Sequence, residues 1–287
     1  MSPDDGLVAG AVLSDADRTA LLALAERAAR AAGDLVRAAR TGRVSVEDTK
    51  SSPTDVVTEA DRAAEALLRE LLRAERPDDA VLGEEGGAQT GGSGLTWVVD
   101  PIDGTVNYLY GIPVYAVSVA VVQGAVGVPG EWVPVAGCVH NPAIGETWTA
   151  ARGLGAHLDG ERLPDRGTPP PLERALVSTG FGYRSERRRA QARVVADLLP
   201  RVRDIRRIGV SSLDVCGVAS GRADAYYERG LNPWDFAAAW LVATESGVGV
   251  RGPRGGAPSG ELLVAARPPL LEVLADELDR LGADRDQ

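Results

Sequence analysis

The chain has 287 residues, of which 44% are hydrophobic and 25% charged, the composition of an ordinary globular protein. This length fits one large domain or two small lobes. The formal net charge of −10 argues against a nucleic-acid-binding protein, because such proteins usually carry a basic surface. We therefore expect no nucleic-acid partner.

Several features indicate a cytoplasmic protein without a membrane partner. The N-terminus lacks a positively charged segment followed by an apolar one, so no signal peptide is expected. No apolar run approaches membrane-spanning length. Cys138 and Cys216 lie in apolar runs and are expected to be buried free thiols in a reducing compartment.

The N-terminal half predicts two helices followed by a sheet. Residues 1–13 are small, acidic and aperiodic, which predicts a flexible tail. A helix is expected from Ser14 to about Ala39, because apolar residues recur at helical spacing, and a second from Thr58 to Glu75. A Gly-rich loop ends at Gly94. Apolar or alternating runs predict five strands, the last three as an antiparallel meander, at 80–82, 95–99, 115–122, 133–140 and 146–150.

The C-terminal half mixes strands and helices. The Pro-rich segment 167–171 predicts a boundary between an N-terminal α+β lobe, 14–166, and a C-terminal α/β lobe, 167–287. Strands are expected at 175–178, 204–208 and 223–228, and helices at 185–199, 212–220, 232–245 and 269–281. The pattern predicts a mixed α and β fold with helices layered against two sheets.

The most informative segment runs from Trp97 to Thr105. An apolar strand ends at Asp100, and Asp103 returns to the same side after a bend stiffened by proline. Two carboxylates and the Ile102 carbonyl form a hard oxygen site suited to Mg²⁺. Alone, such a segment is equally typical of a plain turn.

The residues after these carboxylates fit a bound phosphate. Gly104 permits a close backbone approach, and Thr105 begins a segment that can form a helix with free N–H groups.

Three further acidic residues have structural explanations when taken singly. Asp235 falls in the first turn of a helix begun by Asn232, where it complements the helix dipole. Asp61 completes a capping box with Thr58. Glu84 lies in a Gly-rich segment after a strand, where an exposed acidic loop would explain it. Together, however, they mark strand ends and helix starts, where sites are built.

The order and spacing of these segments resemble the inositol monophosphatase family from about Ser14 to the C-terminus. The motifs that carry the resemblance are Asp55-Val56-Val57-Thr58-Glu59-Ala60-Asp61, Gly83-Glu84-Glu85, Asp100-Pro101-Ile102-Asp103-Gly104-Thr105-Val106-Asn107-Tyr108 and Trp234-Asp235. The resemblance implies the layered α/β/α/β/α sandwich of the inositol monophosphatase and fructose bisphosphatase type, as a homodimer. It also implies Mg²⁺-dependent hydrolysis of a small phosphorylated polyol, foremost inositol 1-phosphate.

The resemblance also implies roles for the acidic residues. Glu84, Asp100 and the Ile102 carbonyl would hold one Mg²⁺. Asp100, Asp103 and Asp235 would hold a second.

Other roles follow from the same resemblance. Asp61 and Thr105 would activate the water, with Glu84 as an alternative, and Lys50 would give electrostatic support. On the substrate side, the resemblance implies contacts from Asp103, Gly104, Thr105, Ser211 and Glu228.

Departures from the commonest family pattern concern the leaving group and not the metal ligands. Asn232-Pro233 replaces the His-Cys seen before Trp-Asp in animal members, and Val106 and Tyr108 are also unusual. Glu228 and Ile102 favour a polyol phosphate.

Three alternatives stay open. The first is a related phosphatase acting on histidinol phosphate, fructose bisphosphate or a nucleotide 3′-phosphate. The second is a catalytically idle binding or regulatory relative, which would be expected to lose an acidic ligand. The third is RNA binding through the arginines of 184–189, which a solvated helix face explains better in an acidic chain.

Overall fold

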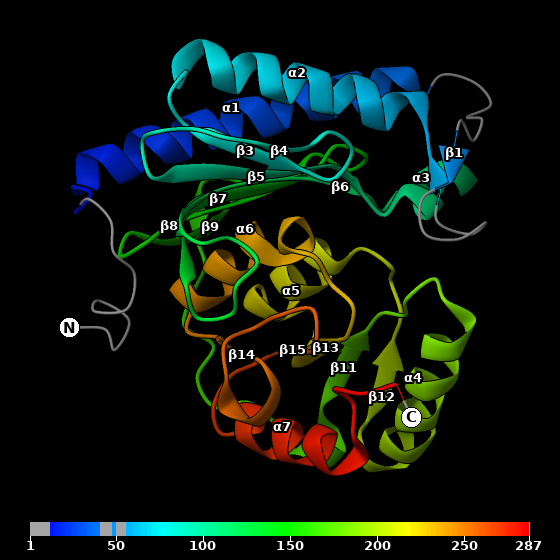
Figure 1. Cartoon of the computed structure of the whole chain (residues 1–287). Coiled ribbons are helices and arrows are strands. Elements are labelled where there is room, and N and C mark those ends of the chain that lie inside the picture. Colours follow the sequence, from blue (N-terminus) through cyan, green and yellow to red (C-terminus); the bar gives the residue numbers. More distant parts are fainter. Residues whose placement is uncertain (1–11, 41–47, 50–55, 287) are drawn as a thin grey trace.

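The structure, a computed structural model, describes residues 12–40, 48–49 and 56–286. Lys50 and nearly all of the expected N-terminal tail lie outside these residues. Helices and sheets alternate in five layers, which confirms the predicted α/β/α/β/α sandwich (Figure 1). Among the described residues, no helix combines the length and the apolar character needed to cross a membrane.

The first layer consists of α1 (Asp15–Ala39) and α2 (Glu59–Glu75), which cover one face of the larger sheet. Both begin at a capping box, Ser14 with Asp17 and Thr58 with Asp61. Their buried side chains pack with the facing side chains of the sheet into one apolar cluster. The predicted starts of both helices are therefore confirmed.

The larger sheet has eight strands in the order β10-β9-β8-β7-β6-β5-β3-β4. Only the β3–β5 pair is parallel, and the predicted meander is confirmed as β6, β7 and β8. The strands are β3 Ala80–Gly83, β4 Gly87–Gln89, β5 Leu95–Asp103, β6 Ala116–Gly124, β7 Trp132–Asn141, β8 Glu146–Ala151, β9 Gly155–Leu158 and β10 Glu161–Arg162. Strands β9 and β10 were not predicted from the sequence, and β4 lies where a loop was expected.

Short elements complete the N-terminal half. A two-stranded ribbon pairs β1 (Asp48–Thr49) with β2 (Val56–Val57), and α3 (Thr105–Tyr110) follows β5.

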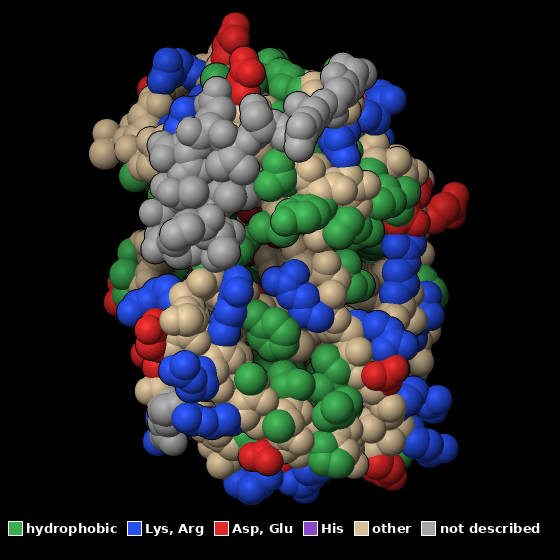
Figure 2. Space-filling model, turned by 90° about the vertical axis from the view of Figure 1, so that its right-hand side faces the viewer, with side chains coloured by type: hydrophobic (Ala, Val, Ile, Leu, Met, Phe, Trp, Pro, Cys, Tyr) green, Lys and Arg blue, Asp and Glu red, His purple; other side chains and the backbone are tan. Residues whose placement is uncertain are grey.

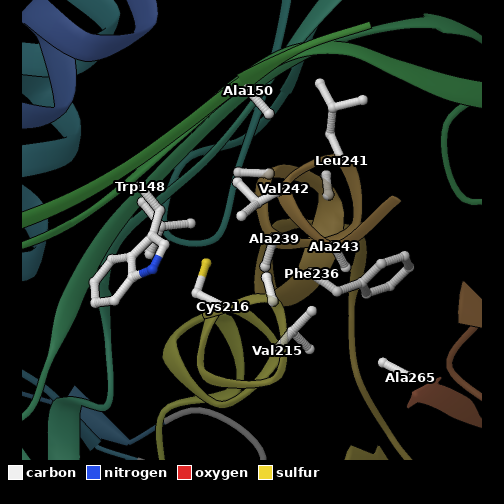
Figure 3. Close-up of a cluster of buried hydrophobic side chains, with 14 of the residues drawn as sticks. Trp148, Ala150, Val215, Cys216, Phe236, Ala239, Leu241, Val242, Ala243 and Ala265 are labelled. Atoms are coloured by element: carbon white, nitrogen blue, oxygen red, sulfur yellow. The ribbon is translucent and has the colours of Figure 1, made fainter. Parts of the chain in front are cut away.

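The middle layer consists of α5 (Ser211–Ala219) and α6 (Pro233–Glu245), which lie between the two sheets. Every residue of α5 is buried, as expected for a helix enclosed on all sides. Figure 3 shows Val215 and Cys216 of α5 beside Phe236 and Val242 of α6, with Trp148 of β8 facing them. Cys138 and Cys216 are buried free thiols, as predicted.

The smaller sheet has five strands in the order β12-β11-β13-β15-β14, and α4 (Ser185–Leu198) and α7 (Leu270–Leu281) form the outer layer. The strands are β11 Leu176–Thr179, β12 Asp204–Arg206, β13 Ala225–Glu228, β14 Gly249–Arg251 and β15 Leu263–Ala266. Three single-turn 3₁₀ helices are Leu172–Arg174, Leu199–Arg201 and Pro253–Gly255. Strands β14 and β15 were not predicted from the sequence.

The close approach of α6 to the larger sheet depends on Gly137 in β7. A Cβ atom at Gly137 would lie 2.9 Å from the Cα of Ala238, which is backbone and has no rotamer to change. We expect Gly137→Val to lower the free energy of unfolding by about 1–3 kcal/mol through overpacking, measured by urea denaturation. Gly92→Val is the matched control, because a Cβ there meets nothing within 4 Å. Equal midpoints for the two variants would contradict this packing.

Candidate active site

The candidate site forms around a β-bulge near the end of β5. Asp100 lies opposite Ser118 of β6, but Asp103 lies opposite Ala116, so three steps along β5 match two along β6. Side chains alternate between the faces of a regular strand, which would send residues three apart in opposite directions. The extra residue of the bulge brings Asp100 and Asp103 back to the same side of the sheet. A bulge also accommodates Pro101, which has no N–H to donate. The strand was predicted to stop at Asp100; it continues through the bulge.

One cavity of about 360 Å³ collects carboxylates from distant parts of the chain. Four of its acidic side chains surround the bulge, and a fifth lies at the end of β13. These five are Glu84, Asp100, Asp103, Asp235 and Glu228. Ile102, Gly104, Thr105 and Ser211 also line the cavity. Every described candidate from the sequence therefore lines it except Asp61, which reaches it through Thr105.

The carboxylates around the bulge repel one another. Asp100 is only 1% exposed, and its Oδ1 accepts a hydrogen bond from the Ile102 N–H at 3.0 Å. Burial, followed by the charges of Glu84, Asp103 and Asp235, raises the pKa of Asp100 well above its ordinary value. Burial and the charges of Glu84 and Asp103 likewise raise the pKa of Asp235.

Two serines hold the carboxylate of Asp103. Its Oδ2 accepts hydrogen bonds from the Ser212 N–H at 2.7 Å and the Ser211 hydroxyl at 3.2 Å. Burial raises its pKa, and these serine hydrogen bonds oppose the rise.

The donor set of this cavity fits a hard divalent cation. Among the described residues, no three His, Cys, Asp or Glu side chains form a group that could hold a metal as they stand. However, the charge of Glu84 lies close enough to raise the pKa of Asp100, and a cation bound between the two carboxylates would offset this repulsion. Buried carboxylates beside the Ile102 carbonyl are oxygen ligands of the kind that Mg²⁺ prefers.

Asp61 and Thr105 are in contact, as the resemblance implied. Asp61 is fully buried, and its Oδ2 accepts hydrogen bonds from the Thr58 N–H at 2.8 Å and the Thr58 hydroxyl at 2.6 Å. Its Oδ1 lies 3.2 Å from Thr105 Oγ1, which also lies 3.0 Å from the Ile102 carbonyl oxygen. The capping box of α2 therefore holds a carboxylate at the edge of the site.

Glycine shapes the cavity wall at two positions. Gly104 has a φ of 92°, and a Cβ there would lie 2.7 Å from a methyl group of Val210. A Cβ at Gly180 would lie 1.8 Å from Glu228 Oε2. These glycines leave the cavity open beside Thr105 and bring the backbone against Glu228.

The substrate-side candidates Glu228 and Ser211 already make hydrogen bonds within the protein. Glu228 Oε2 accepts a hydrogen bond from the Tyr226 hydroxyl at 2.6 Å, and burial raises the Glu228 pKa to about 7 against the opposing effects of Tyr226 and Arg207. The Ser211 hydroxyl is engaged by Asp103 and, at 3.1 Å, by the Asp235 carbonyl. Ser211 thus joins two carboxylate-bearing segments.

One wall of the cavity is basic and was not predicted from the sequence; it is formed by Arg184, Arg187, Arg207 and Arg229. In the face of the molecule drawn in Figure 2, Lys and Arg side chains gather over the lower half. The solvated-face interpretation of the 184–189 cluster is therefore incomplete. A signal was present in Gly180-Phe181-Gly182-Tyr183, which follows the carboxyl end of β11, where ligands bind in open sheets.

Another buried carboxylate lies apart from the bulge, in a second cavity of about 200 Å³ lined by Ile144, Trp148 and Leu213. This residue, Asp214 of α5, is 2% exposed, and its Oδ1 has no hydrogen-bond partner among the described residues. Burial raises its pKa to about 8, and a hydrogen bond from Ser178 opposes the rise.

Comparison with known proteins agrees with this fold and cavity. The family model described as "Inositol monophosphatase family" matches residues 17–283. The inositol-1-monophosphatase of Mycobacterium bovis is 47% identical over 244 residues, covering 81% of each chain. The Nus factor SuhB of Pasteurella multocida is 36% identical over 260 residues, covering 88% of this chain and 94% of that one.

Among solved structures, Mycobacterium tuberculosis SuhB superposes with a TM-score of 0.77 at 41% identity, covering 93% of this chain and 99% of that one. The fold class is thus that of a layered α/β protein with two sheets and a shared helical layer. The chain belongs to the inositol monophosphatase family.

The raised pKa of Asp214 predicts a pH-dependent stability. An acid whose pKa is higher in the folded state holds its proton more tightly there, so the free energy of unfolding falls as pH rises from about 4 through about 8. One such group contributes a slope of at most about 1.4 kcal/mol per pH unit. We expect Asp214→Asn to flatten the decline between pH 5.5 and 8 in urea denaturation, with the exposed Asp276→Asn as control. Parallel curves for wild type and Asp214→Asn would contradict the assignment.

Proposed function

We propose that this protein is a Mg²⁺-dependent phosphatase that hydrolyses inositol 1-phosphate to inositol and phosphate. The observation that carries the proposal is a single cavity in which the β5 bulge, Glu84 and Asp235 present hard oxygen donors beside the Asp61–Thr105 contact. Membership of the inositol monophosphatase family supports it.

In this proposal, Glu84, Asp100 and the Ile102 carbonyl hold one Mg²⁺, and Asp100, Asp103 and Asp235 hold a second. When bound, Mg²⁺ neutralises the phosphate dianion, makes a water molecule more acidic and stabilises the departing oxygen. The serine hydrogen bonds to Asp103 fix one of its oxygens and leave the other for the cavity.

Asp61 and Thr105 provide the route for the proton of the attacking water. The Thr105 hydroxyl passes its proton toward Asp61 Oδ1 and takes one from the water on its other side. Thr58 holds the other Asp61 oxygen through two hydrogen bonds, so Oδ1 stays directed at Thr105. Glu84 is the alternative water-positioning group, and Lys50 is proposed as electrostatic support.

The substrate spans the cavity from the bulge to the basic wall. Gly104 and Thr105 lie beside the phosphate, and Asp103, Ser211 and Glu228 lie beside the alcohol half. Arg184 and Arg207 attract an anionic substrate toward an otherwise acidic protein, while the charges of Arg187 and Arg229 are partly balanced by ion pairs with Asp286.

Two other functions rank lower. A phosphatase for histidinol phosphate, fructose bisphosphate or a nucleotide 3′-phosphate would use the same carboxylates with another alcohol. A regulatory relative is considered because the chain resembles proteins named Nus factor SuhB. The retention of all four acidic candidates around the bulge favours the enzyme, because buried carboxylates that repel one another are costly without a cation.

For assembly and location, we propose a cytoplasmic homodimer with no nucleic-acid or membrane partner. The exposed side chains of Ile144 and Ile208 beside the second cavity offer an apolar surface for a second copy.

The first test is phosphate release, with Mg²⁺ and with chelator, from inositol 1-phosphate, histidinol phosphate, fructose 1,6-bisphosphate and adenosine 3′,5′-bisphosphate. We expect Mg²⁺-dependent preference for inositol 1-phosphate. Asp100→Asn should lower kcat/KM by more than the roughly 10- to 100-fold typical of residues that only support metal ligands. Circular dichroism checks that this variant is folded. Turnover of none of the four esters would overturn the proposal.

The second test concerns Glu228. Glu228→Gln weakens hydrogen bonds to substrate hydroxyls, which to a charged group are worth about 1.5–3 kcal/mol each. We expect kcat/KM for inositol 1-phosphate to fall by about tenfold or more, while turnover of p-nitrophenyl phosphate, which has no such hydroxyls, stays within about twofold. Equal losses on both substrates would show that Glu228 does not select the alcohol.

A further inference from the structure

A buried carboxylate outside the cavity holds the turn that carries Glu84. Glu65 lies on α2, one helical turn after Asp61, and is 2% exposed. Its Oε2 accepts a hydrogen bond from the Glu85 N–H at 2.7 Å, and its Oε1 accepts one from the Gly86 N–H at 2.7 Å. Both donors belong to the backbone that follows Glu84.

A neighbouring arginine completes this contact. Arg69 Nε donates to Glu65 Oε1 at 2.8 Å, and Arg69 Nη2 donates to the Gly87 carbonyl at 2.6 Å. Both partners of the ion pair are largely shielded, with side-chain exposures of 18% for Arg69 and 3% for Glu65. Hydrogen bonds to ionised groups are shorter and stronger than neutral ones. Glu65 therefore holds N–H groups of the turn, and Arg69 holds one of its carbonyls.

The glycines of the turn leave room for this carboxylate. A Cβ at Gly83 would lie 2.5 Å from Glu65 Oε1, and a Cβ at Gly86 would lie 2.7 Å from the same atom. The turn between β3 and β4 thus closes around the side chain of Glu65. A loop that only connected two strands at the surface would not need glycine on both sides of a buried carboxylate.

We propose that Glu65, with Arg69, is a positioning residue that orients Glu84 toward Asp100 and so sets the affinity of the site for Mg²⁺. The inference rests on the proposed function, since it concerns a proposed metal ligand. Glu65 itself does not line the cavity. Helix α2 then fixes two sides of the site, through Asp61 at Thr105 and through Glu65 behind Glu84.

The test is Glu65→Gln against Glu70→Gln, an exposed glutamate on the same helix. The amide group of glutamine accepts only through its oxygen, so its NH₂ would face one of the two N–H donors and the turn would shift. We expect Mg²⁺ binding by isothermal titration calorimetry to weaken about 10- to 100-fold in Glu65→Gln. We expect kcat at saturating Mg²⁺ to return to within about threefold of wild type, and Glu70→Gln to match wild type in both measurements.

Gly86→Ala moves the same turn without changing any charge and serves if Glu65→Gln fails to fold. It should also weaken Mg²⁺ binding, because its methyl group displaces Glu65 or Arg69. Unchanged Mg²⁺ affinity in the folded variants, with only a lower thermal midpoint, would overturn the inference and leave Glu65 a structural residue. Wild-type protein that neither binds Mg²⁺ nor releases phosphate would instead overturn the proposed function.

Discussion

The extra residue in β5 between Asp100 and Asp103 is the constraint on which the candidate site depends. Without it, the strand alternation would place the two carboxylates on opposite faces of the larger sheet. With it, both line one cavity, and the Ile102 carbonyl oxygen lies between them in sequence, 3.0 Å from Thr105 Oγ1. The cost is a group of acids with raised pKa values, because their surroundings disfavour the charged forms.

Helix α2 shows that a structural and a functional explanation of one residue need not compete. The capping box explains Asp61 fully at the level of the sequence, and it forms as predicted. The same hydrogen bonds hold the other carboxylate oxygen against Thr105, so the cap also orients a group of the site. Asn232 and Asp235 repeat this arrangement at the start of α6, where the Asn232 N–H donates to the Asp235 carboxylate at 2.6 Å.

Local patterns predicted the elements that have strong local signals. Capping residues fixed the starts of α1, α2 and α6, and apolar runs located β5 to β8. By contrast, β14 and β15 are only three and four residues long, and they are held by pairing of β14 with β15 and of β15 with the earlier strand β13, which periodicity does not reveal. The same limit applies to the site. The acidic residues have recognisable motifs, but Arg207 and Arg229 reach the cavity only through the packing of the second sheet.

The middle helical layer has a consequence for how the chain is made. One face of the larger sheet, complete by residue 162, is covered by α5 and α6, which end only at residue 245. During synthesis, the ribosome therefore releases an apolar sheet surface well before the helices that cover it are available. Such surfaces invite aggregation while they stay open. The order of the elements along the chain thus makes chaperone capture of the unfinished N-terminal half a physical expectation of this architecture.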